Sequence, residues 1–192
     1  PSLASQVVTE ALILPVIESL ATDHPSLEPH LYCHPDDAIV QRLLRGQIDV
    51  AFTDRVYEHP RLVCHPLGKL NRGVFARPEH PLRSAGPVTL AQLEGSPFAI
   101  HSEDDGWPSD RERGVGLKVD SIRAAVEACS RSELLIALPD LMVRQSGGAL
   151  SRMSEEDLPA LPVYAIAPPV LREAGRVERL IEAVARRCDA DL

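Results

Sequence analysis

The stretch RLLRGQIDVAFTD, residues 42–54, joins the end of an apolar-periodic helix to a short run of strand-forming residues through Gly46. A glycine after the last helical turn lets the chain reverse directly, so we expect the strand to follow the helix closely. The nearly continuous apolar run is typical of a strand buried in a parallel sheet. Asp49 lies near the start of this strand. We interpret its carboxylate as an acceptor for the preceding turn, with a ligand contact as the alternative.

Helices and strands alternate ahead of this stretch. Apolar residues recur at helical spacing over residues 4–22, where Pro15 is expected to kink the helix. The segment LEPHLYCH, residues 27–34, predicts a strand. Asp36 or Asp37 is suited to cap a second helix, which leads into Gly46. The order helix, strand, helix, strand indicates the α/β class, not a helical bundle or a sandwich.

The rest of the chain repeats this alternation. LVCHPLG (62–68) and GVFARP (73–78) predict two strands with a short connection. Residues 79–88 are rich in proline and glycine, so we expect the chain to cross there from one lobe to another. Further elements are predicted in the segments LAQLE, SPFAIH, LKVD, SIRAAVEACSR, LLIALP and VYAIA, followed by a closing amphipathic helix.

Charge and hydropathy exclude several classes of function. The 192 residues carry a net charge of −8, and Lys69 and Lys118 are the only lysines. A surface of this sign repels phosphate backbones, so these residues are not expected to bind nucleic acid themselves. No segment approaches the ~18 consecutive apolar residues of a membrane span, so no membrane partner is predicted.

The sequence contains no established catalytic or phosphate-binding motif. Of the seven histidines, five precede proline and are interpreted as extended or turn backbone: His24, His34, His59, His65 and His80. Cys33-His34 and Cys64-His65 could each offer one ligand to a shared metal, because neighbouring strand residues point to opposite faces. We predict neither a metal nor a cofactor, and no catalytic residue.

Two other groups of residues have more than one interpretation. The four cysteines, which lie far apart, are expected to be reduced thiols, with disulfides as the alternative: Cys33, Cys64, Cys129 and Cys188. The acidic run SEDDGWPSDRER, residues 102–113, is interpreted as a solvated loop, with a general acid/base cluster as the alternative. Trp107 either packs this loop or covers a pocket.

Several segments occur in an order and spacing that resemble one known family. They are LLRGQIDVAFTD, HPL at 80–82, VTLAQLEGSPFAI, IALPD and PVYAIAPP. Together they resemble the effector-binding domain of a LysR-type transcriptional regulator, and the resemblance covers nearly the whole chain. It implies an α/β fold with two Rossmann-like lobes joined by two crossover strands, periplasmic-binding-protein-like (type 2). Residues 1–78 plus 163–192 would form the first lobe, and residues 79–162 the second.

The resemblance also implies a function. A small-molecule effector would bind in the inter-lobe cleft and modulate DNA binding by the full-length regulator. The winged helix-turn-helix of the family's full-length members is absent from these residues, and an apolar strand is expected just before Pro1. The protein is expected to be cytoplasmic and to form a homodimer or higher oligomer through its first helix and the strand near Leu31.

Ligands of open α/β sheets lie beyond the carboxyl ends of strands, where helix N-termini offer free donors. Applied to the resemblance, this geometry predicts six ligand-binding residues: Ser2, Asp36, Thr53, His101, Ser102 and Ser121. Simple helix capping is the alternative for Ser2, Asp36 and Ser121. A carboxylate at Asp36 would disfavour a carboxylate effector there and favour a polar or cationic group.

Two rival functions fit the same scaffold. A solute-binding protein of a transport system would share the fold but would normally carry an export signal. An enzyme would need a catalytic constellation, which the sequence does not supply. The order of motifs favours the ligand-sensing domain of a regulator, and the protein is not expected to be an enzyme.

Overall fold

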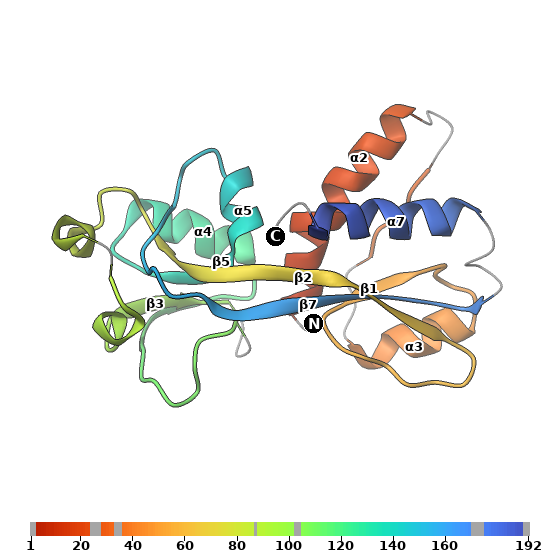
Figure 1. Cartoon of the computed structure of the whole chain (residues 1–192), viewed down its shortest axis with the longest axis horizontal. Coiled ribbons are helices and arrows are strands. Elements are labelled where there is room, and N and C mark those ends of the chain that lie inside the picture. The colour runs from red at the N-terminus through yellow and green to blue at the C-terminus, as the bar shows by residue number, and fades with distance from the viewer. Residues whose placement is uncertain are drawn as a thin grey trace. The chain divides into compact units, whose positions relative to one another are not determined.

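The computed structural model describes residues 3–23, 28–32, 36–86, 88–101, 105–169 and 175–189. The chain divides into two compact units, Pro1–Leu70 with Pro162–Leu192, and Asn71–Leu161. Two strands run from one unit into the other, β2 (Val63–Ala76) and β7 (Leu158–Ala167), and they are neighbours in the sheet order β1-β7-β2-β5 (Figure 1).

The expected crossing at residues 79–88 is wrong. Those of its residues that the structure describes belong to the second unit, where Pro81–Ala85 form the 3₁₀ helix η2. The chain crosses earlier, within β2. The two strands predicted at 62–68 and 73–78 are one strand of 14 residues. Gly68 keeps this strand continuous with a φ of +145°, and a Cβ there would lie 2.9 Å from the Cβ of Cys188.

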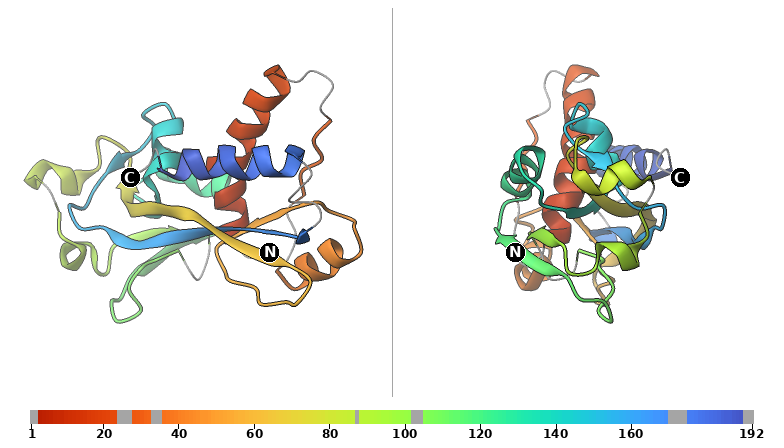
Figure 2. Two further views of the ribbon diagram at one scale, coloured as in Figure 1. Left: turned by 45° about the vertical axis from the view of Figure 1, so that its right-hand side comes forward. Right: turned by 90° about the vertical axis from the view of Figure 1, so that its left-hand side faces the viewer.

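Helices of the first unit follow the apolar pattern. The predicted helix over 4–22 is confirmed as α1 (Leu3–Val8), the π-helical turn η1 (Thr9–Ile13) and α2 (Leu14–Asp23). Helix α3 (Asp36–Leu44) is also confirmed, and it ends before Gly46, whose φ is +66°. Closing helix α7 (Gly175–Asp189) packs against η1 and α2 (Figure 1, Figure 2).

Strand predictions in this unit are less accurate. Residues 28–32 form no strand, and the rest of the segment predicted at 27–34 lies outside the described residues. Strand β1 is short (Ala51–Thr53) and pairs antiparallel with β7, so the expectation of a parallel neighbour is wrong for this pair. Asp49 precedes β1 and is exposed, so the buried strand contains no carboxylate. One face of α3 packs on β1 and β7 through Ile39, Leu43, Ala51 and Ile166.

The second unit is built on two parallel strands, β3 (Pro97–Ile100) and β4 (Gly114–Lys118). Strand β5 (Ile136–Pro139) pairs antiparallel with β2, as does the short β6 (Ser151–Arg152). Helix α4 (Ile122–Arg131) is confirmed, η3 (Leu90–Leu93) is a 3₁₀ helix, and α5 (Asp140–Gln145) was not predicted. The apolar core of this unit gathers around Phe98, Leu93, Leu135 and Val74, all buried.

A side chain of the closing helix donates to a backbone carbonyl of the first helix. Pro15 has no N–H, so it cannot donate to the carbonyl of Ala11 four residues earlier. Arg187 on α7 donates from Nε to this carbonyl over 3.1 Å, and Ala11 is completely buried. The guanidinium therefore fixes α7 to the irregular part of the first helix.

Replacing Arg187 with methionine should lower the free energy of unfolding by about 1.5 kcal/mol, because the apolar stem is kept and a charge-assisted hydrogen bond is lost. Urea unfolding followed by circular dichroism measures this change. Arg186→Met is the matched control, since the pair that Arg186 forms with Glu182 is exposed and its loss should cost less than about 0.5 kcal/mol. Equal stability of the two variants would contradict the proposed role of Arg187.

Candidate ligand-binding site

Four polar side chains form one cluster within the second unit, which we call the His101 cluster: Arg72, His101, Asp105 and Arg113. Arg72, His101 and Asp105 are each less than 8% exposed, at 7%, 6% and 4%. Charged groups are rarely buried to this degree unless they are paired. The cluster is therefore a candidate functional site of this unit.

His101 directly follows β3, at the carboxyl ends of the two parallel strands. The end of β3 is held on one side by the hydrogen bond from the N–H of Val119 to the carbonyl of Ile100, 3.0 Å. On the other side, Nε2 of His101 lies 3.1 Å from the carbonyl oxygen of Ala137 on β5. A carbonyl oxygen only accepts, so Nε2 carries the hydrogen and donates it.

The imidazole of His101 is kept neutral. Burial lowers its pKa below the usual value of 6.5, against the raising effects of the Ala137 hydrogen bond and the Asp105 carboxylate. The guanidinium groups of Arg113 and Arg72 lower it further. At neutral pH the side chain therefore has one N–H, at Nε2, and one lone pair, at Nδ1.

Asp105 holds the described part of the following loop, residues 105–113, on the core. Its Oδ2 lies 2.6 Å from Nη1 of Arg113, and its Oδ1 accepts from the backbone N–H of Trp107 over 3.2 Å. The side chains of this pair are only 1% and 14% exposed. The interpretation of this run as a solvated loop is therefore wrong for Asp105, because its charge is paired out of contact with water.

Trp107 packs the loop. Its ring lies 4.8 Å from the ring of Phe98, and Nε1 donates to the carbonyl of Arg111 over 3.0 Å. The guanidinium of Arg113 lies over the ring of Phe98, 5.7 Å from its centroid. Of the two alternatives for Trp107, the structure supports packing of the loop.

Arg72 reaches the cluster from β2. Its Nε donates to the carbonyl of Pro159 over 2.5 Å. The guanidinium lies against Gly106, where a Cβ would come within 2.5 Å of Cζ of Arg72. Gly106 also has a φ of +91°, so both the backbone and the close approach require glycine at this position.

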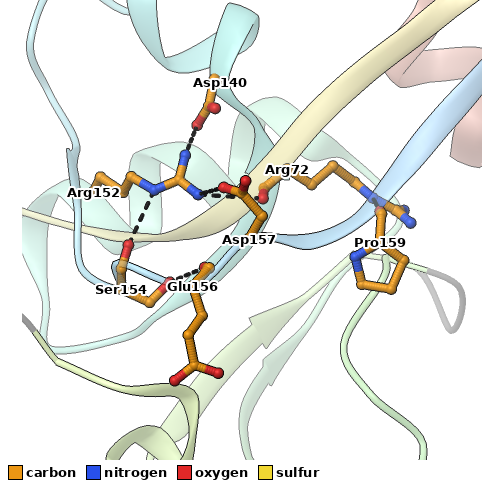
Figure 3. A network of polar contacts seen from close by, with 7 residues as sticks. All are labelled: Arg72, Asp140, Arg152, Ser154, Glu156, Asp157 and Pro159. Atoms are coloured by element: carbon orange, nitrogen blue, oxygen red, sulfur yellow. Dashed lines mark hydrogen bonds and ion pairs between the residues drawn. The ribbon is translucent and has the colours of Figure 1, made fainter.

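A second polar network in this unit surrounds Arg152 (Figure 3). Arg152 donates to Asp140 at the start of α5 over 2.5 Å, to the carbonyl of Ser154 over 3.0 Å, and to Asp157. A hollow of about 490 Å³ lies beside it, lined by Arg83, Gly86, Arg152, Met153, Ser154 and Glu155. The carboxylates of Asp140 and Asp157 both pair with Arg152, so its guanidinium is already neutralised. This hollow is therefore a weaker candidate for a ligand than the His101 cluster.

Three of the six predicted ligand-binding positions lie wholly or partly outside the described residues. Ser2 and Ser102 lie outside the described residues. Asp36 is the first residue of α3, and its side chain also lies outside the described part. Their predicted roles stay predictions.

The other three positions are described. Thr53 is 1% exposed at the end of β1, and its Oγ1 accepts from the N–H of Arg55 over 3.2 Å. Ser121 accepts from the N–H of Ala124 over 3.3 Å and caps α4. In the second unit, His101 and Ser121 follow the neighbouring parallel strands β3 and β4, so they lie at the same edge of that sheet. Thr53 belongs to the first unit.

Sequence reasoning missed Arg72, Asp105 and Arg113. A signal existed for Arg72, because an arginine inside an otherwise strand-like segment needs a partner. For Asp105 and Arg113 the polar composition of the loop concealed their burial, which depends on packing against Phe98.

Three of the four cysteines lie among the described residues. Cys64, Cys129 and Cys188 are free thiols. Burial raises the pKa of Cys129 to about 12 and that of Cys188 to about 11, so both stay protonated at neutral pH. Within the described ranges, no group of three or more His, Cys, Asp or Glu side chains is placed to hold a metal ion. No helix in those ranges has the length and apolarity needed to cross a membrane.

The α/β units and the two strands that connect them define a periplasmic-binding-protein-like fold. Residues 3–189 match the family described as LysR substrate binding domain, and the chain belongs to this family. The predicted resemblance to LysR-type regulators is thereby confirmed.

Individual proteins agree with this assignment. The HTH-type transcriptional regulator YeiE of Escherichia coli is 28% identical over 115 residues, which cover 60% of this chain and 36% of the regulator. The chain thus aligns with about a third of that protein.

Solved structures of the same fold include reduced OxyR from Neisseria meningitidis, with a TM-score of 0.72, 17% identity and coverage of 94% and 91% of the two chains. The regulatory domain of CcmR from Synechocystis PCC6803, in complex with 2-PG, has a TM-score of 0.71, 16% identity and coverage of 94% of each chain.

Replacing Arg113 with methionine should lower the free energy of unfolding by about 3–5 kcal/mol, because the carboxylate of Asp105 would stay buried without its partner. Urea unfolding measures the loss. The matched control is Arg111→Met, since Arg111 and Glu94 form a more exposed pair, with side chains 31% and 42% exposed, and that change should cost at most about 1 kcal/mol. A loss of similar size in both variants would contradict the burial of the Asp105–Arg113 pair.

Proposed function

We propose that the chain senses a small-molecule effector for a LysR-type transcriptional regulator, and that the His101 cluster is part of its binding site. The observation that carries this proposal is a group of buried charges at the carboxyl ends of β3 and β4. Ligands of open α/β sheets bind beyond these ends. Membership of the substrate binding domain family supports the same conclusion.

His101 is the predicted ligand residue that the geometry favours most. Thr53, at the end of β1 in the first unit, is a second proposed contact. For Ser121 the capping hydrogen bond to Ala124 favours a structural role. The complex of CcmR with 2-PG supports the idea that a domain of this fold binds a small molecule.

The chain would act by binding and not by catalysis. An effector that binds one arrangement of the domain more tightly than another shifts the population toward that arrangement. In the full-length regulator this shift would change the affinity of a DNA-binding domain, since coupled sites influence one another reciprocally. A transcriptional regulator acts on chromosomal DNA, so we propose a cytoplasmic location. A transport protein would share the fold, but the family match favours the regulator.

A thermal-shift screen of the purified chain against amino acids, polyamines, sugars, and aromatic and aliphatic acids tests this proposal. A ligand at ~100 times its Kd should stabilise the chain by roughly 2.7 kcal/mol, which raises Tm by a few degrees. Thr53→Val and His101→Gln should reduce the shift, whereas the surface change Thr22→Ala should leave it intact. No shift with any compound, or equal shifts in all variants, would contradict the proposed site.

We also propose that the chain forms a homodimer or higher oligomer through the region of Leu31 and Tyr32. These neighbouring apolar side chains are 39% and 55% exposed. Exposed apolar residues that lie together are characteristic of interaction surfaces.

Sedimentation equilibrium at tens of micromolar chain should therefore give at least twice the monomer mass. Tyr32→Asp should shift the equilibrium toward monomer, because it places a charge in the proposed interface. Val56→Asp is the matched control, since Val56 is as exposed, at 59%, in the same unit, and it should not change the mass. A monomeric wild-type chain would contradict the proposal.

A further inference from the structure

The hollow beside Arg152 is separate from the His101 cluster. Its volume is about 490 Å³, and small-molecule sites commonly measure roughly 300–1,000 Å³. The described residues that line it all belong to the second unit, Asn71–Leu161. None of these lining residues is a predicted effector contact or a member of the His101 cluster. The hollow is therefore a second place in this unit where a small molecule could bind.

Two of the lining residues, Met153 and Ser154, are buried and fixed by hydrogen bonds. They are 3% and 2% exposed. The N–H of Met153 donates to the carbonyl of Val74 over 2.8 Å, and the N–H of Val88 donates to the carbonyl of Met153 over 3.3 Å. The hydroxyl of Ser154 donates to the carbonyl of Glu156 over 2.9 Å (Figure 3). This side of the hollow is formed without a ligand.

Helix η2 and the glycine that follows it supply another side of the hollow. The helix is anchored at its start by His80, whose Nε2 lies 3.1 Å from the carbonyl oxygen of Glu133 and whose Nδ1 accepts from the N–H of Leu82. At its end, the N–H of Gly86 donates to the carbonyl of Arg83 over 3.1 Å. A Cβ at Gly86 would meet no atom within 4 Å, so the backbone borders open space there.

Three charged side chains line the hollow, and they differ in what they already bind. Arg152 is paired with Asp140 and Asp157. Arg83 and Glu155 are exposed, and neither side chain has a hydrogen-bond or ion-pair partner among the described residues. They do not pair with each other either. One guanidinium and one carboxylate are therefore left for a ligand.

The residues next to Arg83 do not supply a counter-charge. The side chains at 84, 85 and 87 lie outside the described part of the chain, and they are serine, alanine and proline, which carry no charge. A guanidinium has several N–H donors in a planar arrangement that fits a carboxylate. A carboxylate only accepts, and an ammonium group is its charged donor.

We propose that this hollow binds a zwitterionic amino acid, with the carboxylate of the ligand on Arg83 and its ammonium group on Glu155. A simple anion would satisfy only the guanidinium, and a simple amine only the carboxylate. The buried Met153 offers an apolar contact to the side chain of the ligand, which favours an apolar amino acid. The site is additional to the proposed effector site and does not depend on it.

The test uses compounds that differ in one charged group. Leucine, methionine and phenylalanine are each compared with the N-acetyl derivative, which lacks the ammonium group, and with the amide, which lacks the carboxylate. Isothermal titration of the wild-type chain at pH 7 should give, for at least one amino acid, a Kd at least about tenfold below the Kd of both derivatives. No binding of any amino acid at millimolar concentration, or equal binding of the derivatives, would overturn the inference.

Two substitutions separate the charges of the hollow. In Arg83→Gln the amino acid should bind no better than its amide does to the wild-type chain, and in Glu155→Gln no better than its N-acetyl derivative. Both changes should leave thermal unfolding of the ligand-free chain unaltered, because neither side chain has a partner to lose. Arg131→Gln is the control and should keep the wild-type Kd, since its pair with Glu127 lies on an exposed face of α4.

His101→Gln distinguishes the hollow from the proposed effector site. It should leave the Kd of the amino acid unchanged. A loss of affinity in His101→Gln together with wild-type affinity in Arg83→Gln would assign the ligand to the His101 cluster, which overturns this inference and leaves the proposed function standing. Wild-type affinity in both Arg83→Gln and Glu155→Gln would also overturn it.

Discussion

Charge that is removed from water must be paired, and this requirement organises the second unit. Asp105 and Arg113 pair with almost no exposure, and Arg72 donates to a carbonyl 87 residues away in the sequence. These contacts fix residues 105–113 and hold Trp107 on the core. If either charge of the pair were removed, the remaining one would be buried alone at a cost of several kcal/mol. The position of His101 at the end of β3 depends on this paired environment.

Local signals in the sequence predicted most of the helices and the order of elements. The apolar spacing of α3 and the glycine that follows it determine that helix and its end, since both act within a few residues. The strands were harder to predict. The strand predicted at 62–68 ended at Gly68, yet β2 continues through it. A glycine is needed there because a Cβ would lie 2.9 Å from Cys188, which is distant in the sequence. The turn-rich segment at 79–88 predicted that the chain passes there from one unit to the other. It passes within β2 instead.

The candidate site was only partly predictable for the same reason. His101 could be found, because it ends a predicted strand and does not precede proline as most histidines of the chain do. Asp105 and Arg113 could not be found, because the loop's composition is that of a solvated turn. Their burial comes from the packing of Trp107 and Arg113 on Phe98, a tertiary contact that no local pattern encodes.

Among the described residues, two buried thiols give each unit its own chemical reporter. Cys188 on α7 belongs to the first unit and Cys129 on α4 to the second. A thiol that is protonated and covered reacts with an alkylating reagent only when its surroundings open. The modification rates of Cys188 and Cys129 therefore measure local opening of the two units separately, in a single sample of the unaltered chain. Ligand-induced changes in rigidity could be assigned to one unit or the other in this way without introducing a label.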